Sequence, residues 1–400
     1  MTLYPVADQD RKATNILGRS TYQKSRSQLA GDRMKIERAT LREIPLRLKE
    51  FFEISSGGQQ DRRILLLTLC GEGLEGWSEC VASEDPSYAY ETTETAWHIL
   101  TDYILPEIIG GQADAPEKIL DPVHWIRGHP MARAAVEMAG WDLAARAEGV
   151  SLSQKLGGER EYIPVGVSVG IKPTDDELHD QVQSYIEEGY ARVKIKIKPG
   201  RDIEMLAGLR ERFPDVAFMV DANSAYSLAD IDRLREFDAL SLMMIEQPLS
   251  YSDFLEHARL QEQIETPVCL DESIKSEGDL ALALHLGSCR IVNIKPGRVG
   301  GLSVSRGIHD TMRSAGLPVW CGGMLESGVG RAHNVALASL PGFTLPGDIS
   351  ASRRYWERDI VSPEFEVEDG VMKVPSGPGI GVDLDLDRIQ SLTVREASFS

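Results

Sequence analysis

The sequence is poor in cysteine and in long apolar runs. Its 400 residues include only five cysteines, an odd number without the CxxC spacing of zinc sites. This excludes a disulfide framework and indicates a reducing, cytoplasmic compartment. The longest apolar runs, such as residues 64–67 and 242–245, fall far short of the roughly 20 residues that a membrane-spanning helix needs.

Positive charge is also scarce. The chain has 43 Lys and Arg against 62 Asp and Glu, for a net charge of −19. A protein with this net negative charge repels phosphate backbones and anionic membrane surfaces. We therefore expect neither nucleic acid nor membranes as partners. Hydrophobic residues make up 42% of the chain, enough for a large core, and the length predicts more than one domain.

The first part of the chain divides into a tail and a mixed domain. Residues 1–33 are polar and slightly basic and lack the apolar stretch of a secretory signal, so we expect an N-terminal extension or tail. Residues 34–160 predict an α+β domain, with strands around 64–70 and 77–81 and helices at 88–103 and 131–148. Within it, the small and glycine-rich segment 53–60 is either a mobile loop over a site or a plain hairpin connection.

From residue 161 onward a regular alternation of strands and helices begins. Short apolar runs rich in β-branched residues recur about every 25 residues, which is typical of βα units around a parallel sheet. Eight such strands within 161–350 fit a (β/α)₈ barrel, and a doubly wound sheet is disfavoured because no GxGxxG motif follows the first strand. Residues 351–400 add no further unit and are expected to pack back on the first domain. The eight strand candidates are 163–169, 192–197, 217–221, 242–246, 268–271, 291–295, 318–321 and 343–345.

Four ionisable residues end four successive strands of this pattern. Asp221, Glu246, Asp271 and Lys295 follow one another at intervals of 25, 25 and 24 residues, so each takes the same place in its unit. In a barrel that place is the C-terminal mouth, where catalytic residues gather. Three carboxylates brought together there would repel one another unless a cation joined them, and oxygen ligands favour Mg²⁺. Any one of these acids alone would be an ordinary surface residue at the end of a strand. Because all three occupy the same position in successive units, the pattern favours a metal site.

Lysines form a second pattern on one predicted strand. Lys194, Lys196 and Lys198 alternate with apolar residues, which places all three on one face. Alone, a row of lysines on one face would indicate an edge strand exposed to solvent. Next to the strands that carry the acids, it predicts that the lysines face the barrel axis, except that Lys198 leaves the barrel. Lys196 and Lys295 would then lie across the barrel from each other, one on each side of a bound carboxylate. We expect burial and nearby positive charge to lower their pKa values, as a proton-abstracting base requires.

In combination these motifs are highly specific, and the chain from residue 34 onward resembles the enolase superfamily. Within its muconate-lactonising subgroup, it is most similar to the o-succinylbenzoate synthase/N-succinylamino acid racemase family. The motifs that carry the resemblance are the KIK at 194–196, DAN at 221–223, IEQPL at 245–249, LDES at 270–273, NIKPGRVGG at 293–301 and WCGGMLESG at 320–328.

The resemblance implies a modified (β/α)₈ fold, a (β/α)₇β barrel with an α+β capping domain. It also implies a small carboxylate substrate, closure of segment 53–60 over that substrate, and Mg²⁺ as cofactor, with Mn²⁺ able to replace it. Because acidic barrels of this size often associate, we expect a homo-oligomer. The implied residues are Asp221, Glu246 and Asp271 as metal ligands, Lys196 and Lys295 as acid/base residues, and Asn223 and Lys194 as supporting residues.

Two reactions are tied to this family. One is dehydration of 2-succinyl-6-hydroxy-2,4-cyclohexadiene-1-carboxylate to o-succinylbenzoate in menaquinone biosynthesis, and the other is racemisation of N-succinylamino acids. Both begin by removing a proton alpha to a carboxylate; dehydration needs one base and racemisation needs two, so the two lysines permit either. Arg298 either tunes proton exchange at Lys295 or packs at the barrel rim. A Schiff-base lysine aldolase, which needs no metal, is the alternative from another class.

Overall fold

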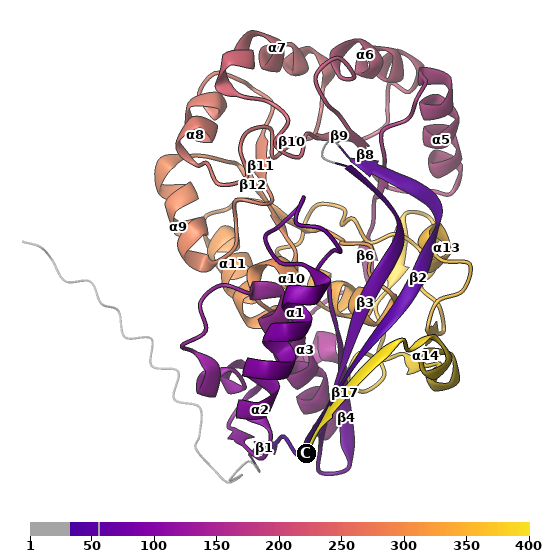
Figure 1. Cartoon of the computed structure of the whole chain (residues 1–400). Coiled ribbons are helices and arrows are strands. Elements are labelled where there is room, and N and C mark those ends of the chain that lie inside the picture. The colour runs from indigo at the N-terminus through magenta and orange to yellow at the C-terminus, as the bar shows by residue number, and fades with distance from the viewer. Residues whose placement is uncertain (1–32, 55–56) are drawn as a thin grey trace, which may run out of the picture. The chain divides into compact units, whose positions relative to one another are not determined.

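The computed structural model describes residues 33–54 and 57–400, so the predicted extension lies outside the described residues except for Arg33. Four antiparallel strands form the first sheet (Figure 1), and the order across it is β17, β2, β3, β4. Alternate residues of β3 point to opposite cores: Ile64 and Leu66 join one apolar cluster, and Leu65 and Leu67 the other. The strands are β2 (Arg38–Ile54), β3 (Gly57–Gly71), β4 (Leu74–Cys80) and β17 (Arg395–Phe399).

Helices follow this sheet, and the central one is buried nearly all round. The predicted helix 88–103 begins only at Thr93, because Thr92 and Thr95 form a capping box there, and it continues as a π-helical turn. A short ladder joins β1 (Met34–Lys35) to β5 (Gln112–Ala113). The helical segments are α1 (Thr93–Ile99), η1 (Leu100–Ile104), α2 (Leu105–Ile108), η2 (Pro116–Lys118), η3 (Asp121–Val123), α3 (Pro130–Ala147) and α4 (Leu152–Leu156).

Seven parallel strands form the second sheet, in sequential order from β7 to β13. Their residues are almost all buried, as expected where helices cover one side of a parallel sheet and side chains fill the other. The strands are β7 (Val167–Val169), β8 (Val193–Lys196), β9 (Phe218–Asp221), β10 (Ile245–Glu246), β11 (Val268–Leu270), β12 (Ile291–Ile294) and β13 (Val319–Cys321).

Both ends of this sheet differ from the predicted strands. The first candidate, 163–169, is split: β6 (Tyr162–Pro164) pairs with β15 (Val371–Lys373), and only β7 joins the barrel. The eighth candidate, 343–345, is no regular strand. Single bridges from Phe343 to Val319 and from Gly347 to Val165 span the gap between β13 and β7 instead. The segment pairs with Val319 at one residue only, Phe343, before the backbone bends at Leu345, which is too short for a ladder.

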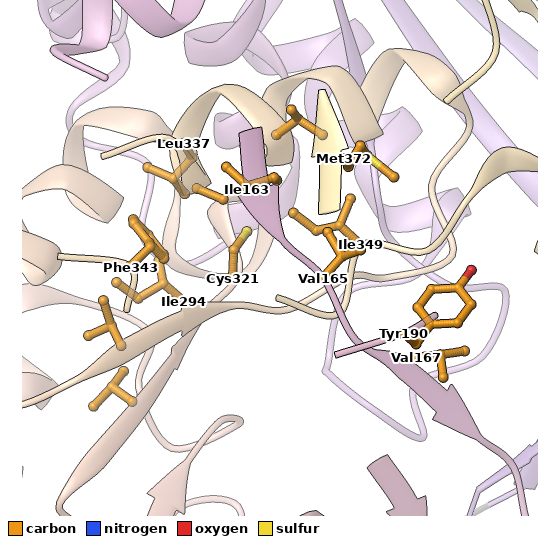
Figure 2. Packing of buried hydrophobic residues seen from close by; sticks show 14 of the residues in the cluster. Ile163, Val165, Val167, Tyr190, Ile294, Cys321, Leu337, Phe343, Ile349 and Met372 are labelled. Carbon is orange, nitrogen blue, oxygen red and sulfur yellow. The ribbon is translucent and has the colours of Figure 1, made fainter. Parts of the chain in front are cut away.

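The closed barrel confirms the expected fold class. Apolar residues from β6, β7 and the bridging segment meet those of β12 and β13 in one cluster, as Figure 2 shows for Val165, Ile294, Cys321, Phe343 and Ile349. The helices around the strands are α5 (Asp175–Glu187), α6 (Ile203–Arg212), η4 (Leu228–Asp230), α7 (Ile231–Glu236), η5 (Phe237–Leu240), α8 (Leu255–Gln261), α9 (Glu277–Leu286), α10 (Pro296–Val299), α11 (Leu302–Ser314) and α12 (Gly328–Ala338).

The last fifty residues return to the first sheet. The final strand, β17, pairs with β2 from Arg395–Glu43 to Phe399–Ala39. The remaining elements here are α13 (Ser352–Tyr355), β14 (Val361–Ser362), β16 (Asp383–Leu384) and α14 (Leu386–Leu392). Among the described residues, none of the helices combines the length and apolar character that crossing a bilayer requires. The division of the chain at 33, 160 and 350 stays a prediction.

Candidate active site

The predicted site residues lie at adjacent strand ends of the barrel. In the β8–β9–β10 register, Lys196 is opposite Asp221, and Asp221 is opposite Glu246. Asp271 and Lys295 each follow directly after the last residue of the next two strands, β11 and β12. The carboxyl ends of parallel strands meet at one edge, so the 24- to 25-residue spacing in sequence has become side-by-side placement in space.

Each of the three predicted ligands is buried and held by cations or amides. Asp221 accepts hydrogen bonds from Lys196 Nζ at 2.6 Å and the Asn223 backbone N–H at 3.0 Å. Glu246 accepts one from Asn293 Nδ2 at 2.7 Å and forms an ion pair with Lys194 Nζ at 3.2 Å. Burial and the neighbouring Asp221 raise the pKa of Glu246, whereas the two lysines overcome burial and hold the pKa of Asp221 below its usual range.

Asp271 is turned toward a different set of partners. Its carboxylate pairs with Lys295 Nζ at 2.8 Å and with the Arg298 guanidinium, and it accepts from the Tyr88 hydroxyl at 3.3 Å. Across residues 33–54 and 57–400, no group of three or more His, Cys, Asp and Glu side chains stands in a metal-binding arrangement. The donor chemistry nevertheless fits a hard divalent cation: three buried carboxylates on adjacent strands, whose charge the lysines and Arg298 now balance.

Lys196 is the last residue of β8 and lies beside the acids. Its Nζ donates to Asp221 and to Asn223 Oδ1 at 2.8 Å, and Asn223 Nδ2 in turn donates to Glu272 Oε1 at 3.0 Å. Burial outweighs these carboxylates and lowers the pKa of Lys196, as expected from the sequence. Lys198, two residues on, is 40% exposed and reaches Glu53 at 3.4 Å, outside the barrel.

Lys295 differs from the expectation in its electrostatics. Besides Asp271, it donates to the Tyr88 hydroxyl at 3.0 Å, and its ammonium lies 4.6 Å from the centre of that ring. Burial works against its charge, but Tyr88 and Glu246 outweigh burial and raise the pKa of Lys295. The expectation of a lowered pKa at both lysines therefore holds at Lys196 and is wrong at Lys295.

Two of the predicted supporting residues, Arg298 and Lys194, contact the predicted ligands directly. Arg298 pairs with Asp271 and donates from Nη1 to the Tyr88 hydroxyl at 3.5 Å, while its Nε donates to the Ile274 carbonyl at 2.9 Å. Asp271 and Tyr88 both contact Lys295, so the influence of Arg298 on Lys295 passes through these two residues. Lys194 lies deeper in the barrel, where it pairs with Asp348 at 2.8 Å as well as with two of the acids.

A hairpin from the first sheet covers the mouth of the barrel. The β2–β3 ladder continues to the pair Ile54–Gly57, which favours the hairpin interpretation of segment 53–60, although residues 55–56 lie outside the described part. In Figure 1 these strands extend toward β8, and the Glu53 carbonyl accepts from the Ile171 backbone N–H at 3.1 Å. Beneath the hairpin is a cavity of about 120 Å³ whose walls include Phe52, Lys196 and Lys295.

A second cavity adjoins the first on the side of Asp271. It measures about 290 Å³, and Tyr88 and Asn223 belong to the walls of both cavities. Sequence reasoning missed Tyr88 because it lies on a loop of the first domain, 207 positions from Lys295, and carries no periodic signal. Glu272 belongs to the LDES motif at 270–273, and Asp348 follows the last strand candidate, but neither position indicates the partners of these carboxylates.

Comparison with known proteins places these features in a family. Residues 36–157 match the mandelate racemase/muconate lactonizing enzyme N-terminal domain, and residues 177–388 match the enolase C-terminal domain-like family. Two similar relatives are an o-succinylbenzoate synthase of Geobacillus stearothermophilus and an N-succinylamino acid racemase of Thermus thermophilus. Each is 49% identical over 361 residues, which is 90% of this chain and 96% and 98% of those proteins.

A solved structure agrees with this assignment. The crystal structure of an enolase superfamily member from Listeria innocua is 42% identical and superposes with a TM-score of 0.89, over 92% of this chain and 99% of that one. Sequence, domain order and fold thus coincide over nearly the whole described region. The chain therefore belongs to the mandelate racemase/muconate lactonizing enzyme family of the enolase superfamily.

Proposed function

We propose that this chain is an o-succinylbenzoate synthase that also racemises N-succinylamino acids at the same site. The observation that carries the proposal is the placement of Lys196 and Lys295 in the wall of one cavity, on strands separated by the three that bear the acids. A substrate carboxylate neutralised by a cation at the acids would have its alpha carbon between two amines. Racemisation as the main activity is the second candidate, because the identity to the Thermus thermophilus racemase, 49%, equals the identity to the Geobacillus stearothermophilus synthase.

The residues divide the work as follows. Asp221, Glu246 and Asp271 would hold Mg²⁺, or Mn²⁺ in its place, and the bound ion supplies positive charge beside the substrate carboxylate. Lys196 Nζ removes the alpha proton, with Asp221 and Asn223 fixing the amine. Lys295 remains an ammonium in dehydration and returns a proton to the opposite face in racemisation. Tyr88 holds Lys295 from the capping side, and Arg298 fixes the carboxylate of Asp271.

The location and assembly of the enzyme are part of the proposal. All five cysteines are free and buried, which suits a reducing cytoplasm. Association into a homo-oligomer remains a proposal that light scattering on the purified chain would check.

Exchange of the alpha proton for deuterium tests the lysine roles. In D₂O with Mg²⁺ and each enantiomer of N-succinylphenylalanine in turn, proton NMR should show exchange of both enantiomers by the wild type. Lys196→Ala should lose at least about 10²-fold with one enantiomer and Lys295→Ala with the other, because each lysine faces one side of the alpha carbon. Lys373→Ala serves as the control, because Lys373 is exposed on β15 and should leave the rate unchanged. Undiminished exchange of both enantiomers by either active-site variant would remove the two-base proposal.

Two further measurements separate the competing functions. The ratio of kcat/KM for dehydration to that for racemisation ranks the two activities of the proposed site. EDTA should abolish both, and borohydride should trap no substrate on the protein. A lysine aldolase would behave in the opposite way, since it forms a reducible imine and needs no metal.

A further inference from the structure

Arg62, on strand β3, is a buried cation with few partners. Its side chain is 1% exposed, yet within the described residues no carboxylate comes within ion-pair distance of it. It donates to the Val81 carbonyl at 3.4 Å and to Ser83 Oγ at 3.5 Å, both long hydrogen bonds, and its Nε has no partner. Burial lowers its pKa, and Glu79 and Glu326 oppose this only at longer range. A desolvated guanidinium with unused donors is costly unless something binds it.

Other buried arginines of the chain are better satisfied. Arg331 donates to the Ser350 and Glu326 carbonyls at 2.7 and 2.9 Å and stacks over Tyr355. Arg298 pairs with a carboxylate and two carbonyls. Arg192 also has an unpartnered Nη1, but it donates to the Pro346 carbonyl at 2.9 Å and lies 3.9 Å from Asp348. Of these four buried arginines, only Arg62 has neither a short hydrogen bond nor a nearby carboxylate among the described residues, which points to a partner that comes from outside the chain.

The side chain of Arg62 lies in the wall of the cavity that also contains Lys196 and Lys295. The lysines belong to the barrel, whereas Arg62 belongs to β3 of the capping sheet, whose first residues, Gly57 and Gly58, line the same cavity. The wall of the cavity therefore combines the two barrel lysines with a cation from the capping sheet. Asp85 also lines it, but that carboxylate is exposed and accepts from the Ser87 backbone N–H.

We propose that Arg62 recognises a second, distal carboxylate of the substrate. The inference rests on the proposed function, whose substrates carry one carboxylate beside the reacting carbon and another at the end of a succinyl chain. The first would lie beside the cation held by the acids, and the lysines are committed to proton transfer, so Arg62 is the remaining cation of the wall. Its planar fork can donate two parallel hydrogen bonds to a carboxylate. A neutral acyl group would leave those donors unsatisfied, and the site would select acyl chains that end in a carboxylate.

Paired substrates test the assignment. N-succinylphenylalanine and N-acetylphenylalanine share the reacting carbon and differ in the distal carboxylate. We expect the wild type to prefer the succinyl compound by at least about tenfold in kcat/KM for deuterium exchange. Arg62→Gln should reduce kcat/KM for the succinyl compound by about 10- to 100-fold, mainly through KM, and leave that for the acetyl compound within about threefold.

Arg63→Gln is the matched control, because Arg63 is the next residue on the same strand, points to the other face and pairs with Glu43 and Glu94. It should retain the wild-type preference. If Arg62→Gln fails to fold, Arg62→Lys keeps the charge without the fork and should show a partial loss. Equal losses on both substrates, or no preference in the wild type, would overturn the role of Arg62.

Calorimetric binding of the two compounds separates this proposal from the proposed function. A wild type that exchanges no proton, yet binds the succinyl compound more tightly than the acetyl one through Arg62, would refute the function and support the recognition site. Equal affinities for the two compounds, or no binding of either, would refute the recognition site whatever the enzyme catalyses.

Discussion

A single lysine shows how strongly partners decide what a residue does. The Lys194 ammonium touches Asp348, Glu246 and Asp221 at 2.8, 3.2 and 3.4 Å and lies 5.1 Å from the centre of the Trp320 ring. Burial opposes its charge, but Asp348 and Glu246 outweigh burial and raise its pKa. Lys194 therefore stays positively charged beside the acids, whereas burial lowers the pKa of Lys196, two residues further along the same strand, as the proposed role of a base requires.

Removing the charge of Asp348 tests this arrangement. Asp348→Asn keeps the shape of the side chain but leaves two buried cations, Lys194 and Arg192, without a shared counter-charge. We expect the free energy of unfolding at pH 7 to fall by about 3–5 kcal/mol in urea titrations. Asp232→Asn, on an exposed carboxylate, should change it by less than about 0.5 kcal/mol. A loss below about 1 kcal/mol for Asp348→Asn would show that the pair is not needed for stability.

At the scale of single residues, the sequence predicts the site residues that recur at regular intervals along the chain, and it misses the site residues that do not. Asp221, Glu246 and Asp271 recur at the end of successive strands, so their neighbourhood follows from the barrel alone. Tyr88 and Arg62 reach the same cavity from the capping domain, and their approach depends on how two domains pack. No local pattern encodes that packing, since each residue lies in an ordinary loop or strand.

At the scale of elements, α3 packs closely on β4, and both elements contribute residues to the two apolar clusters, one of which includes the barrel core. Ser78 Oγ of β4 donates to the Ala135 carbonyl at 2.5 Å, and the Trp77 backbone N–H donates to Asp142 at 2.8 Å. A Cβ atom built on Gly76 would lie 2.2 Å from the Ala139 carbonyl oxygen. Contact between backbones at this distance leaves no room for any side chain on the strand.

Gly76→Ala should therefore be strongly destabilising. Because the obstacle is backbone of a buried helix, relief requires the helix to shift, and we expect a loss of about 2–3 kcal/mol or more in the free energy of unfolding. Gly208→Ala provides the control: it sits in α6 with only the His179 ring near, at 3.8 Å, and should gain about 0.5–1 kcal/mol. Thermal unfolding monitored by circular dichroism checks both, and similar stability for the two variants would contradict this account.

Helices and strands can be predicted from the sequence where their apolar residues recur at regular intervals. The strands of the barrel followed from short apolar runs, but their ends did not. The run 163–169 reads as one strand, yet only its second half joins the barrel, because β15 pairs with the first half from 200 residues further on. Helix α3 has apolar residues on every side. Its burial can therefore be predicted from its apolar composition, but not from a one-sided apolar stripe, because it has none.

At the scale of the whole molecule, buried carboxylates connect the two domains through helix N-termini. Glu79 of β4 accepts from the Ser327 and Gly330 backbone N–H groups at the start of α12. Glu137 of α3 does the same for Leu302 and Ser303 at the start of α11. These contacts use the positive ends of barrel helices to fix the capping domain over the active site. They also make the stability of the molecule depend on pH.

The direction of that dependence follows from the raised pKa values. Burial raises the pKa of Glu79 to about 7, above 4.5 in the unfolded chain, so the folded state holds the proton more tightly. The free energy of unfolding should then fall as pH rises from about 5 to 7, by about 1 kcal/mol per pH unit for this group. Urea titrations with EDTA present should show a shallower fall for Glu79→Gln. Glu204→Gln, at an exposed carboxyl of α6, should keep the wild-type slope, and an equal slope in all three proteins would contradict the assignment.

One pairing at the margin of the capping sheet has a consequence for synthesis. Strand β17, residues 395–399, forms the outer neighbour of β2, which was translated some 350 residues earlier. While the ribosome is still making the barrel, β2 offers an open row of backbone donors and acceptors to any extended chain nearby. Only the arrival of the last residues seals that row. A nascent chain stalled before this point would be a candidate for chaperone capture or aggregation. The β2–β3 hairpin that covers the cavity would then extend from a sheet that still lacks its outer strand.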